Sequence, residues 1–193
     1  MISASNAFEK VLNFNGNLAR IFLDFFGQVL PKNLETRIQG IIVKLARFPS
    51  PDSNGNTTIA ILDEEKGEDN STLVGVNSNR ELVYRIKIED EEREIIASLG
   101  DLNIELNKEF SVVSDFDKGN MTLSINKTHS TTPVSFPDDS KYSSFGYSNF
   151  TGLNNGARIG APVRNFTETN VGDDNNGDNL VALDGEISEF LFF

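Results

Sequence analysis

Pairs of carboxylate side chains in this sequence could catalyse glycoside hydrolysis, because that reaction needs two carboxyl groups at a fixed separation. The acidic run EDEERE supplies Glu89, Glu91 and Glu92, and the C-terminal stretch supplies Glu186 and Glu189. The run lies between two apolar stretches, which predicts a hairpin turn with solvated charges. Glu186 and Glu189 are three residues apart, so in a regular strand their side chains point to opposite faces. Neither set predicts a catalytic pair, and we expect no enzymatic activity.

Aspartates in two loops could bind calcium, which prefers carboxylate and carbonyl oxygens. The segment VGDDNNGDN offers Asp173, Asp174 and Asp178, and DFDKGN offers Asp115 and Asp117. Neither segment has the spacing of an EF-hand loop, and ordinary Asx turns explain both. Turns are the preferred interpretation. Calcium at the first segment is the metal site that the sequence leaves open, and we expect no other cofactor.

A cluster of aromatic side chains could contact a glycan or another protein. The Gly/Ser-rich segment KYSSFGYSNFTG contains Tyr142, Phe145, Tyr147 and Phe150. Aromatic rings beside polar groups suit a contact surface, since the ring is apolar and its surroundings can hydrogen-bond. The alternative, which we prefer, is an irregular strand whose aromatic side chains pack on the core.

Composition excludes several other functions. The chain has no cysteine and one histidine, His129 in a polar loop sequence, so thiolate metal sites and a Ser-His-Asp triad are hard to build. With 29 acidic and 17 basic residues, the net charge of -12 argues against nucleic acid and anionic membranes as partners. The N-terminal sequence lacks the features of a signal peptide. We therefore expect synthesis in a cytoplasm.

The elements that position these residues are strands, because apolar residues alternate with polar ones. The pattern is clear in LVYRIKI, with Leu82, Tyr84, Ile86 and Ile88 on one face, and in MTLSIN. GIIVKLARF is apolar on both faces, which predicts a central strand. Turn sequences rich in Gly, Asn and Asp separate the strands, and this arrangement is typical of a sandwich or barrel. Residues 18–30 fit a strand or a helix, and we favour a strand for their first half.

Several segments, in order, resemble a laminin G-like domain of the concanavalin A-like lectin/glucanase superfamily. The resemblance begins at LNFNG and includes ETRIQGIIVKLARF and EFSVVSDFDKGNMTLSINKT. ARIGAP at Ala157–Pro162 and the closing DGEISEFLFF are its most specific parts. This sequence differs in having no Trp, and Lys127 stands where relatives carry Gly. The resemblance implies one domain, residues 1–193, folded as a two-sheet antiparallel β-sandwich, a jelly roll whose last strand pairs near the first.

A lone jelly roll without a catalytic site or a signal peptide suits a structural protein of a virus particle. We expect a bacteriophage-type virion surface protein, either a capsid decoration or a fibre component. Its partners would be other virion proteins, copies of itself in a homo-oligomer, and host glycans. The alternative is a monomeric carbohydrate-binding module. An enzyme of the glucanase branch is the least favoured hypothesis.

Overall fold

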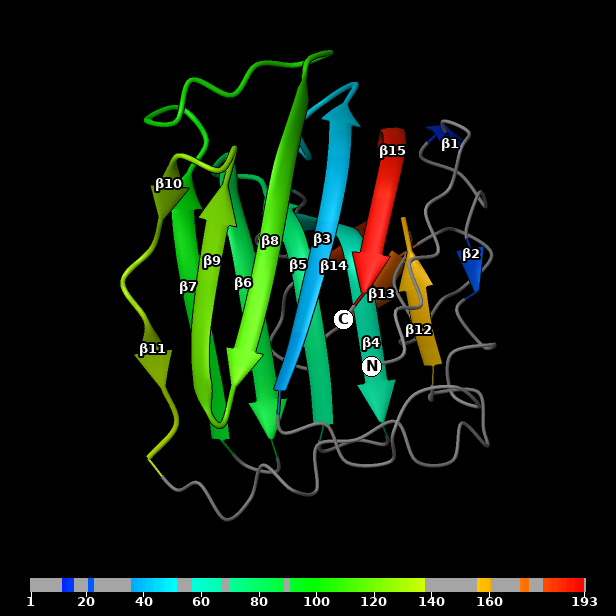
Figure 1. Ribbon diagram of the computed structural model, residues 1–193. Coiled ribbons are helices and arrows are strands. Elements are labelled where there is room, and N and C mark those ends of the chain that lie inside the picture. Colours follow the sequence, from blue (N-terminus) through cyan, green and yellow to red (C-terminus); the bar gives the residue numbers. More distant parts are fainter. Residues whose placement is uncertain are drawn as a thin grey trace.

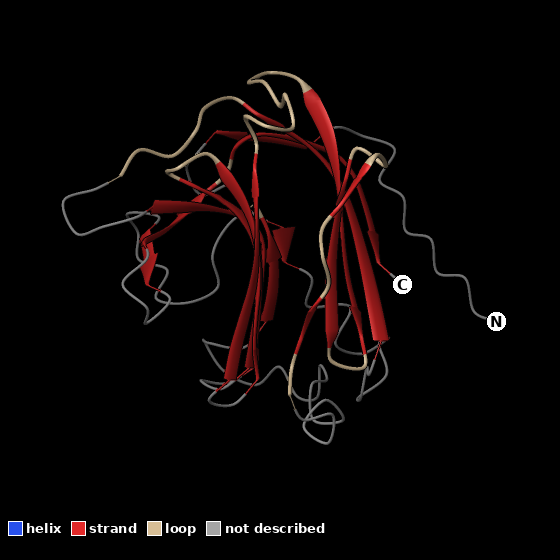
Figure 2. Ribbon diagram, turned by 90° about the vertical axis from the view of Figure 1, so that its left-hand side faces the viewer, coloured by secondary structure: helices blue, strands red, loops and turns tan. Residues whose placement is uncertain are grey.

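The computed structural model describes residues 12–15, 21–22, 36–51, 57–66, 70–88, 91–137, 156–160, 171–173 and 179–192. Within these ranges every regular element is a β-strand, and no helix is long and apolar enough to cross a membrane. The strands form two sheets that lie face to face as two layers (Figures 1 and 2). The predicted β-sandwich is therefore confirmed.

The seven-stranded sheet contains the predicted central strand β3, which lies between β15 and β8. β11 pairs with β9 beside β10 and completes this sheet. Its strands, in spatial order, are β1 (Leu12–Asn15), β15 (Asp184–Phe192), β3 (Thr36–Leu45), β8 (Glu109–Asp117), β9 (Asn120–Ile125), β10 (His129–Ser130) and β11 (Val134–Ser135).

The eight-stranded sheet is built around a meander of four strands, β4 to β7. β12 pairs with both β2 and β4, so the late ARIG segment belongs to this sheet. Its strands are β13 (Val171–Asp173), β14 (Asn179–Ala182), β4 (Thr57–Lys66), β5 (Asn70–Asn77), β6 (Glu81–Ile88), β7 (Glu91–Ser98), β12 (Gly156–Ile159) and β2 (Ile21–Phe22).

The C-terminal segment forms the predicted closing strand, which pairs with β1 on one side and β3 on the other (Figure 1). Ile187 and Phe190 are buried between the sheets, whereas Leu191 is half-buried on the outer face. The apolar run FLFF predicts a strand buried on both faces, and the structure confirms this prediction for the inner face only. A Cβ on Gly185 would lie 2.0 Å from the Lys44 carbonyl oxygen, so the close approach of β15 to β3 requires glycine there.

Among the strands that the structure describes, one pair departs from the antiparallel expectation, since β14 runs parallel to β4. A hairpin forces neighbouring strands to be antiparallel, but β14 reaches β4 from a distant part of the chain, after pairing with β13. The buried residue Leu183 then links β14 directly to β15 in the other sheet. This one-residue connection joins the two sheets at a corner.

The core lies between the sheets and follows the predicted alternation. Leu82, Ile86 and Ile88 of β6 face it, as do Met121 and Leu123 of β9. At the open side between the sheets, β11 contacts both β7 and β9 (Figures 1 and 2). Phe136, directly after β11, is buried and fills this side of the core. Its ring packs edge-on against that of Phe116, with 6.3 Å between the ring centres, and the Arg93 guanidinium lies 5.4 Å from the centre of the Phe136 ring.

β-Bulges interrupt the alternation in two strands. In β4 the pairing with β5 shifts between Ala60 and Leu62, and in β15 the pairing with β3 shifts between Ile187 and Glu189. An extra residue reverses which face each later side chain takes. Both bulges change the positions of charged residues considered below.

Candidate functional site

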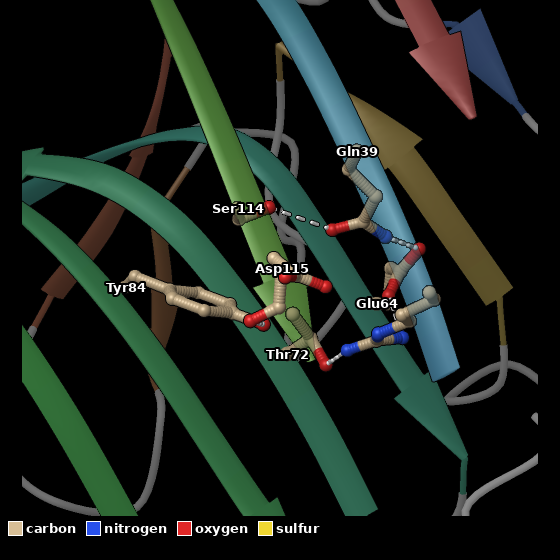
Figure 3. A network of polar contacts seen from close by, with 7 residues as sticks. Gln39, Glu64, Thr72, Tyr84, Ser114 and Asp115 are labelled. Atoms are coloured by element: carbon tan, nitrogen blue, oxygen red, sulfur yellow. Dashed lines mark hydrogen bonds and ion pairs between the residues drawn. The ribbon is translucent and has the colours of Figure 1, made fainter. Parts of the chain in front are cut away.

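Six polar side chains meet between the two sheets, and we call them the interior polar cluster (Figure 3). All six residues are buried, although a sandwich core is normally apolar. Both sheets contribute side chains, so the cluster joins the two layers. Its members are Arg37 and Gln39 of β3, Ser114 of β8, Glu64 of β4, Thr72 of β5 and Tyr84 of β6.

Glu64 is the centre of the interior polar cluster. One carboxylate oxygen lies 2.7 Å from Arg37 Nη1, and the other accepts a hydrogen bond from Gln39 Nε2 at 2.9 Å. Ser114 donates to Gln39 Oε1 at 3.1 Å, and Arg37 Nη2 donates to Thr72 Oγ1. A buried ion pair is tolerated when further hydrogen bonds satisfy its polar atoms. Both carboxylate oxygens of Glu64 and both terminal nitrogens of Arg37 meet that condition.

The Tyr84 hydroxyl completes the cluster and donates to the backbone carbonyl of Asp115 at 3.4 Å. Burial raises the pKa of this hydroxyl far above its ordinary value, because the tyrosinate would be charged in an apolar surrounding. Partial burial and the neighbouring Asp117 carboxylate also raise the pKa of Asp115. Tyr84 is thus held neutral as a hydrogen-bond donor.

The β4 bulge decides which acidic residue enters the core. Regular alternation from Ile59 would bring Asp63 to the inner face, but the bulge pairs Asp63 with Leu73 on the outer face and Glu64 with Thr72 on the inner face. Our sequence reasoning missed this cluster. The available signal was the period-2 pattern of TRIQGIIVKL, in which Arg37 and Gln39 share a face with the apolar Ile41. Since no member is exposed, we interpret the cluster as structural.

A second arginine–glutamate cluster lies on the outer face of the eight-stranded sheet. Arg85 of β6 binds Glu94 of β7, with Nη2 and Nε 2.7 Å and 2.9 Å from Glu94 Oε2. Glu92 Oε1 is 3.6 Å from Arg85 Nε. The side chains of Arg85, Glu92 and Glu94 are 14%, 34% and 27% exposed. We call these three residues the Arg85 cluster, which solvent and a ligand can reach.

Strand register places an apolar side chain beside the Arg85 cluster. Arg85 pairs with Glu94, and Val83 pairs with Ile96 two residues along each strand, on the same face. Two residues of a strand span about 6.8 Å. Ile96 is 51% exposed. On the other side of the cluster Lys87 pairs with Glu92. An ionic and an apolar surface therefore lie next to each other.

The outer face of this sheet differs between its strands. Over β4 and β5 it is closed, because Asp63, Leu73 and Ala60 are 2%, 5% and 0% exposed. Over β6 and β7 the side chains of the Arg85 cluster and Ile96 are accessible. Within the described residues, this part of the sheet is therefore where a polar, accessible surface is held on rigid strands.

The Arg85 cluster can bind hydroxyl groups, but its carboxylates are poorly arranged for glycoside hydrolysis. Hydrolysis requires two carboxyl groups separated by the scissile bond, whereas both glutamates here contact the same guanidinium. Carboxylates and a guanidinium can instead accept from and donate to vicinal hydroxyl groups. The geometry favours recognition of a polyol through charged hydrogen-bonding groups.

Two sequence-based predictions about carboxylates need correction. β6 and β7 pair as the predicted hairpin, but Glu91 and Glu92 lie in β7 rather than in its turn, because β7 begins at Glu91. Glu89 lies outside the described residues, and the sequence reasoning overlooked Glu94. Glu186 and Glu189 do not point to opposite faces. They pair with Lys44 and Ile42, which share the outer face of β3. The extra residue of the bulge between Glu186 and Glu189 places both glutamates on this face. Glu186 forms an ion pair with Lys44 at 2.5 Å.

The other predicted site residues lie largely outside the described residues. These are the aromatic residues Tyr142, Phe145, Tyr147 and Phe150, and the aspartates Asp174 and Asp178. Asp173 is the last residue of β13, and its Cα pairs with that of Asn179. Within the described part of the chain, no group of three or more His, Cys, Asp or Glu residues is arranged to hold a metal ion. The aromatic contact surface and the calcium site remain predictions.

Comparisons with known proteins identify the fold. No protein-family model and no curated protein matches the chain. Among solved structures, the CBM40 module of the Ruminococcus gnavus IT-sialidase, bound to alpha2,3 sialyllactose, has a TM-score of 0.66 at 12% identity, covering 95% of this chain and 89% of that one. Domains LG4-5 of the mouse laminin alpha1 chain have a TM-score of 0.61 at 10% identity, covering 100% of this chain and 44% of that one.

A mutant of NanB sialidase from Streptococcus pneumoniae is also similar, with a TM-score of 0.63 at 14% identity, covering 95% of this chain and 25% of the sialidase. The chain thus spans less than half of the laminin fragment and a quarter of the sialidase. These likenesses establish the fold, a concanavalin A-like jelly roll, as the resemblance implied.

Proposed function

We propose that this protein is a non-catalytic glycan-binding module. The observation that carries the proposal is the Arg85 cluster, which presents charged hydrogen-bonding groups beside the exposed Ile96 on a rigid sheet face. A pyranose offers hydroxyl groups at its edge and an apolar C–H face, so it can use both surfaces. A similar structure supports the proposal, since it is a CBM40 module bound to sialyllactose.

The test is binding of the intact protein and of two variants to an array of neutral and acidic oligosaccharides. Arg85→Ala should lose about tenfold or more in affinity, because hydrogen bonds to charged groups contribute about 1.5–3 kcal/mol. Lys44→Ala is the matched control. It removes a cation paired with a glutamate on the outer face of the other sheet, and binding should not change. Equal binding by the wild type and Arg85→Ala would contradict the site.

Catalysis is tested with the same oligosaccharides by measuring released reducing ends. The proposal expects no product above background for the wild type. Turnover that disappears in Glu92→Gln or Glu94→Gln would overturn it and make the Arg85 cluster an active site.

The virion surface role expected from the sequence is a second proposal. One observation favours contact with other protein surfaces: Ile38 is 42% exposed on the outer face of the seven-stranded sheet, and Ile42 and Leu191 are half-buried on that face. A decoration or fibre protein should form a homo-oligomer and co-purify with particles. Sedimentation analysis of the wild type and of Ile38→Glu tests this role. A monomeric wild type that does not co-purify with particles leaves the monomeric glycan-binding module.

A further inference from the structure

The charges around the Arg85 cluster point to the class of glycan. On the outer face of β6 and β7, the described side chains include two cations, Arg85 and Lys87, and three anions, Glu81, Glu92 and Glu94. The next strands add no cation on this face among side chains that the structure describes, since β5 contributes Ser71 and Leu73, and the residue contributed by β4, Asp63, is buried. Among the described side chains of β6 and β7, the negative charges on this face therefore outnumber the positive ones, although an arginine lies at its centre.

Arg85 is the group that would bind an acidic sugar, and its position makes that binding unfavourable. A ligand carboxylate would have to replace Glu94, whose oxygen lies 2.7 Å from Arg85 Nη2. It would also enter beside the Glu92 carboxylate, 3.6 Å from Arg85 Nε. Like charges brought together at a binding interface are strongly unfavourable. The net charge of -12 adds long-range repulsion of an anionic glycan.

An uncharged sugar meets no such repulsion. Its hydroxyl groups can donate to the carboxylates of Glu92 and Glu94 and accept from the Arg85 guanidinium. Its apolar C–H face can pack on Ile96, which lies one residue pair further along the same face. The existing ion pairs then hold the charged groups in position, so the ligand does not have to break them.

We propose that the Arg85 cluster selects uncharged glycans and that Glu92 and Glu94 exclude sialylated and other acidic ones. This inference rests on the proposed glycan-binding function, and it assigns a ligand class different from the sialyllactose in the similar CBM40 structure. The glutamates are thus specificity-determining residues, and Arg85 contributes hydrogen bonds rather than an anion site.

The test uses matched oligosaccharide pairs on an array, each a neutral core and its sialylated form, followed by titration calorimetry of the best pair. The wild type should bind the neutral member about tenfold or more tightly, with little dependence on salt, because the ligand has no charge to screen. Glu92→Gln/Glu94→Gln should bind the sialylated member more tightly than the wild type does. Glu186→Gln/Glu189→Gln makes the same charge change on the other sheet and should leave the preference unchanged.

The outcomes separate this inference from the function on which it rests. Wild-type preference for sialylated members would overturn the inference and retain the glycan-binding function. An unchanged preference in Glu92→Gln/Glu94→Gln would also overturn it, provided that the variant unfolds at the same urea concentration as the wild type. Absence of binding to every glycan would overturn the proposed function itself.

Discussion

The interior polar cluster and the Arg85 cluster use the same pair of side chains in opposite surroundings. Arg37 and Glu64 are 3% and 5% exposed, and neighbouring polar groups bind them from both sheets. Arg85 and Glu94 are 14% and 27% exposed and belong to adjacent strands of one sheet. Burial makes a pair costly to break, whereas exposure leaves it open to a ligand. The comparison therefore distinguishes the Arg37–Glu64 pair, which holds the two sheets together, from the Arg85–Glu94 pair, which can contact a ligand.

The largest effect is expected from breaking the buried pair. Glu64→Ala leaves the Arg37 guanidinium in the core without its carboxylate, so the free energy of unfolding should fall by about 3–5 kcal/mol. Urea denaturation followed by circular dichroism measures the change. Glu94→Ala is the control on the outer face and should cost far less. A loss below about 1 kcal/mol for Glu64→Ala would show that water reaches the interior polar cluster.

Removing both buried charges sharpens the same point. Arg37→Met/Glu64→Met should be less destabilising than Glu64→Ala, because apolar replacement of a buried ion pair is often neutral or better. Gln39 and Thr72 would then lose partners, which limits the recovery. A double variant as unstable as the single one would show that the hydrogen bonds to Gln39 and Thr72, rather than the unpaired charge, carry the stability.

An intermediate effect is expected from Tyr84 at alkaline pH. Below its ordinary pKa of 10.0 the hydroxyl is protonated in both the folded and the unfolded chain, and it contributes no pH dependence. Above that pH the unfolded chain releases the proton, whereas the folded chain keeps it because burial raises the pKa. Stability should therefore fall as pH rises above 10, with a slope approaching about 1.4 kcal/mol per pH unit from this group.

Urea denaturation of the wild type and Tyr84→Phe between pH 8 and about 11 measures this contribution. The variant lacks the ionisable hydroxyl, so its stability should fall less steeply over the same range. Equal slopes in the two proteins would mean that the Tyr84 hydroxyl ionises as easily in the folded state as in the unfolded one.

Most of the fold could be predicted from the sequence because alternation records burial directly. The faces of β6 and β9 and the closing strand β15 follow from residues such as Tyr84, Leu123 and Phe190. Even the arginine of the candidate site was correctly placed opposite the core-facing side of LVYRIKI. The period-2 pattern reports which face is buried, and this information is local.

The errors in placing charged side chains arose where one extra residue in a strand shifts the alternation between its two faces. The bulge in β4 exchanges Glu64 for Asp63 at the inner face, and the bulge in β15 brings Glu186 and Glu189 to the same face. A bulge depends on the pairing with a neighbouring strand, so it leaves little trace in a single segment. Cross-strand partners such as Arg85 and Glu94 are likewise known only once the register is known.

The smallest effect on stability is expected from the exposed pair. Arg85→Ala removes a partly exposed ion pair, and such pairs contribute about 0.2–1 kcal/mol, so the free energy of unfolding should fall by no more than that. The contrast with Glu64→Ala is the important result, because both variants remove one member of an arginine–glutamate pair. Arg85→Ala should unfold almost like the wild type in urea and yet bind the glycan about tenfold or more weakly. If Arg85→Ala were as destabilising as Glu64→Ala, loss of binding could be loss of structure.

Arg85→Lys would then distinguish loss of recognition from loss of structure, since it keeps the charge but not the paired donor geometry of the guanidinium. A stable Arg85→Lys protein with weakened binding would assign the Arg85 guanidinium to recognition, and a stable one with full binding would contradict that assignment.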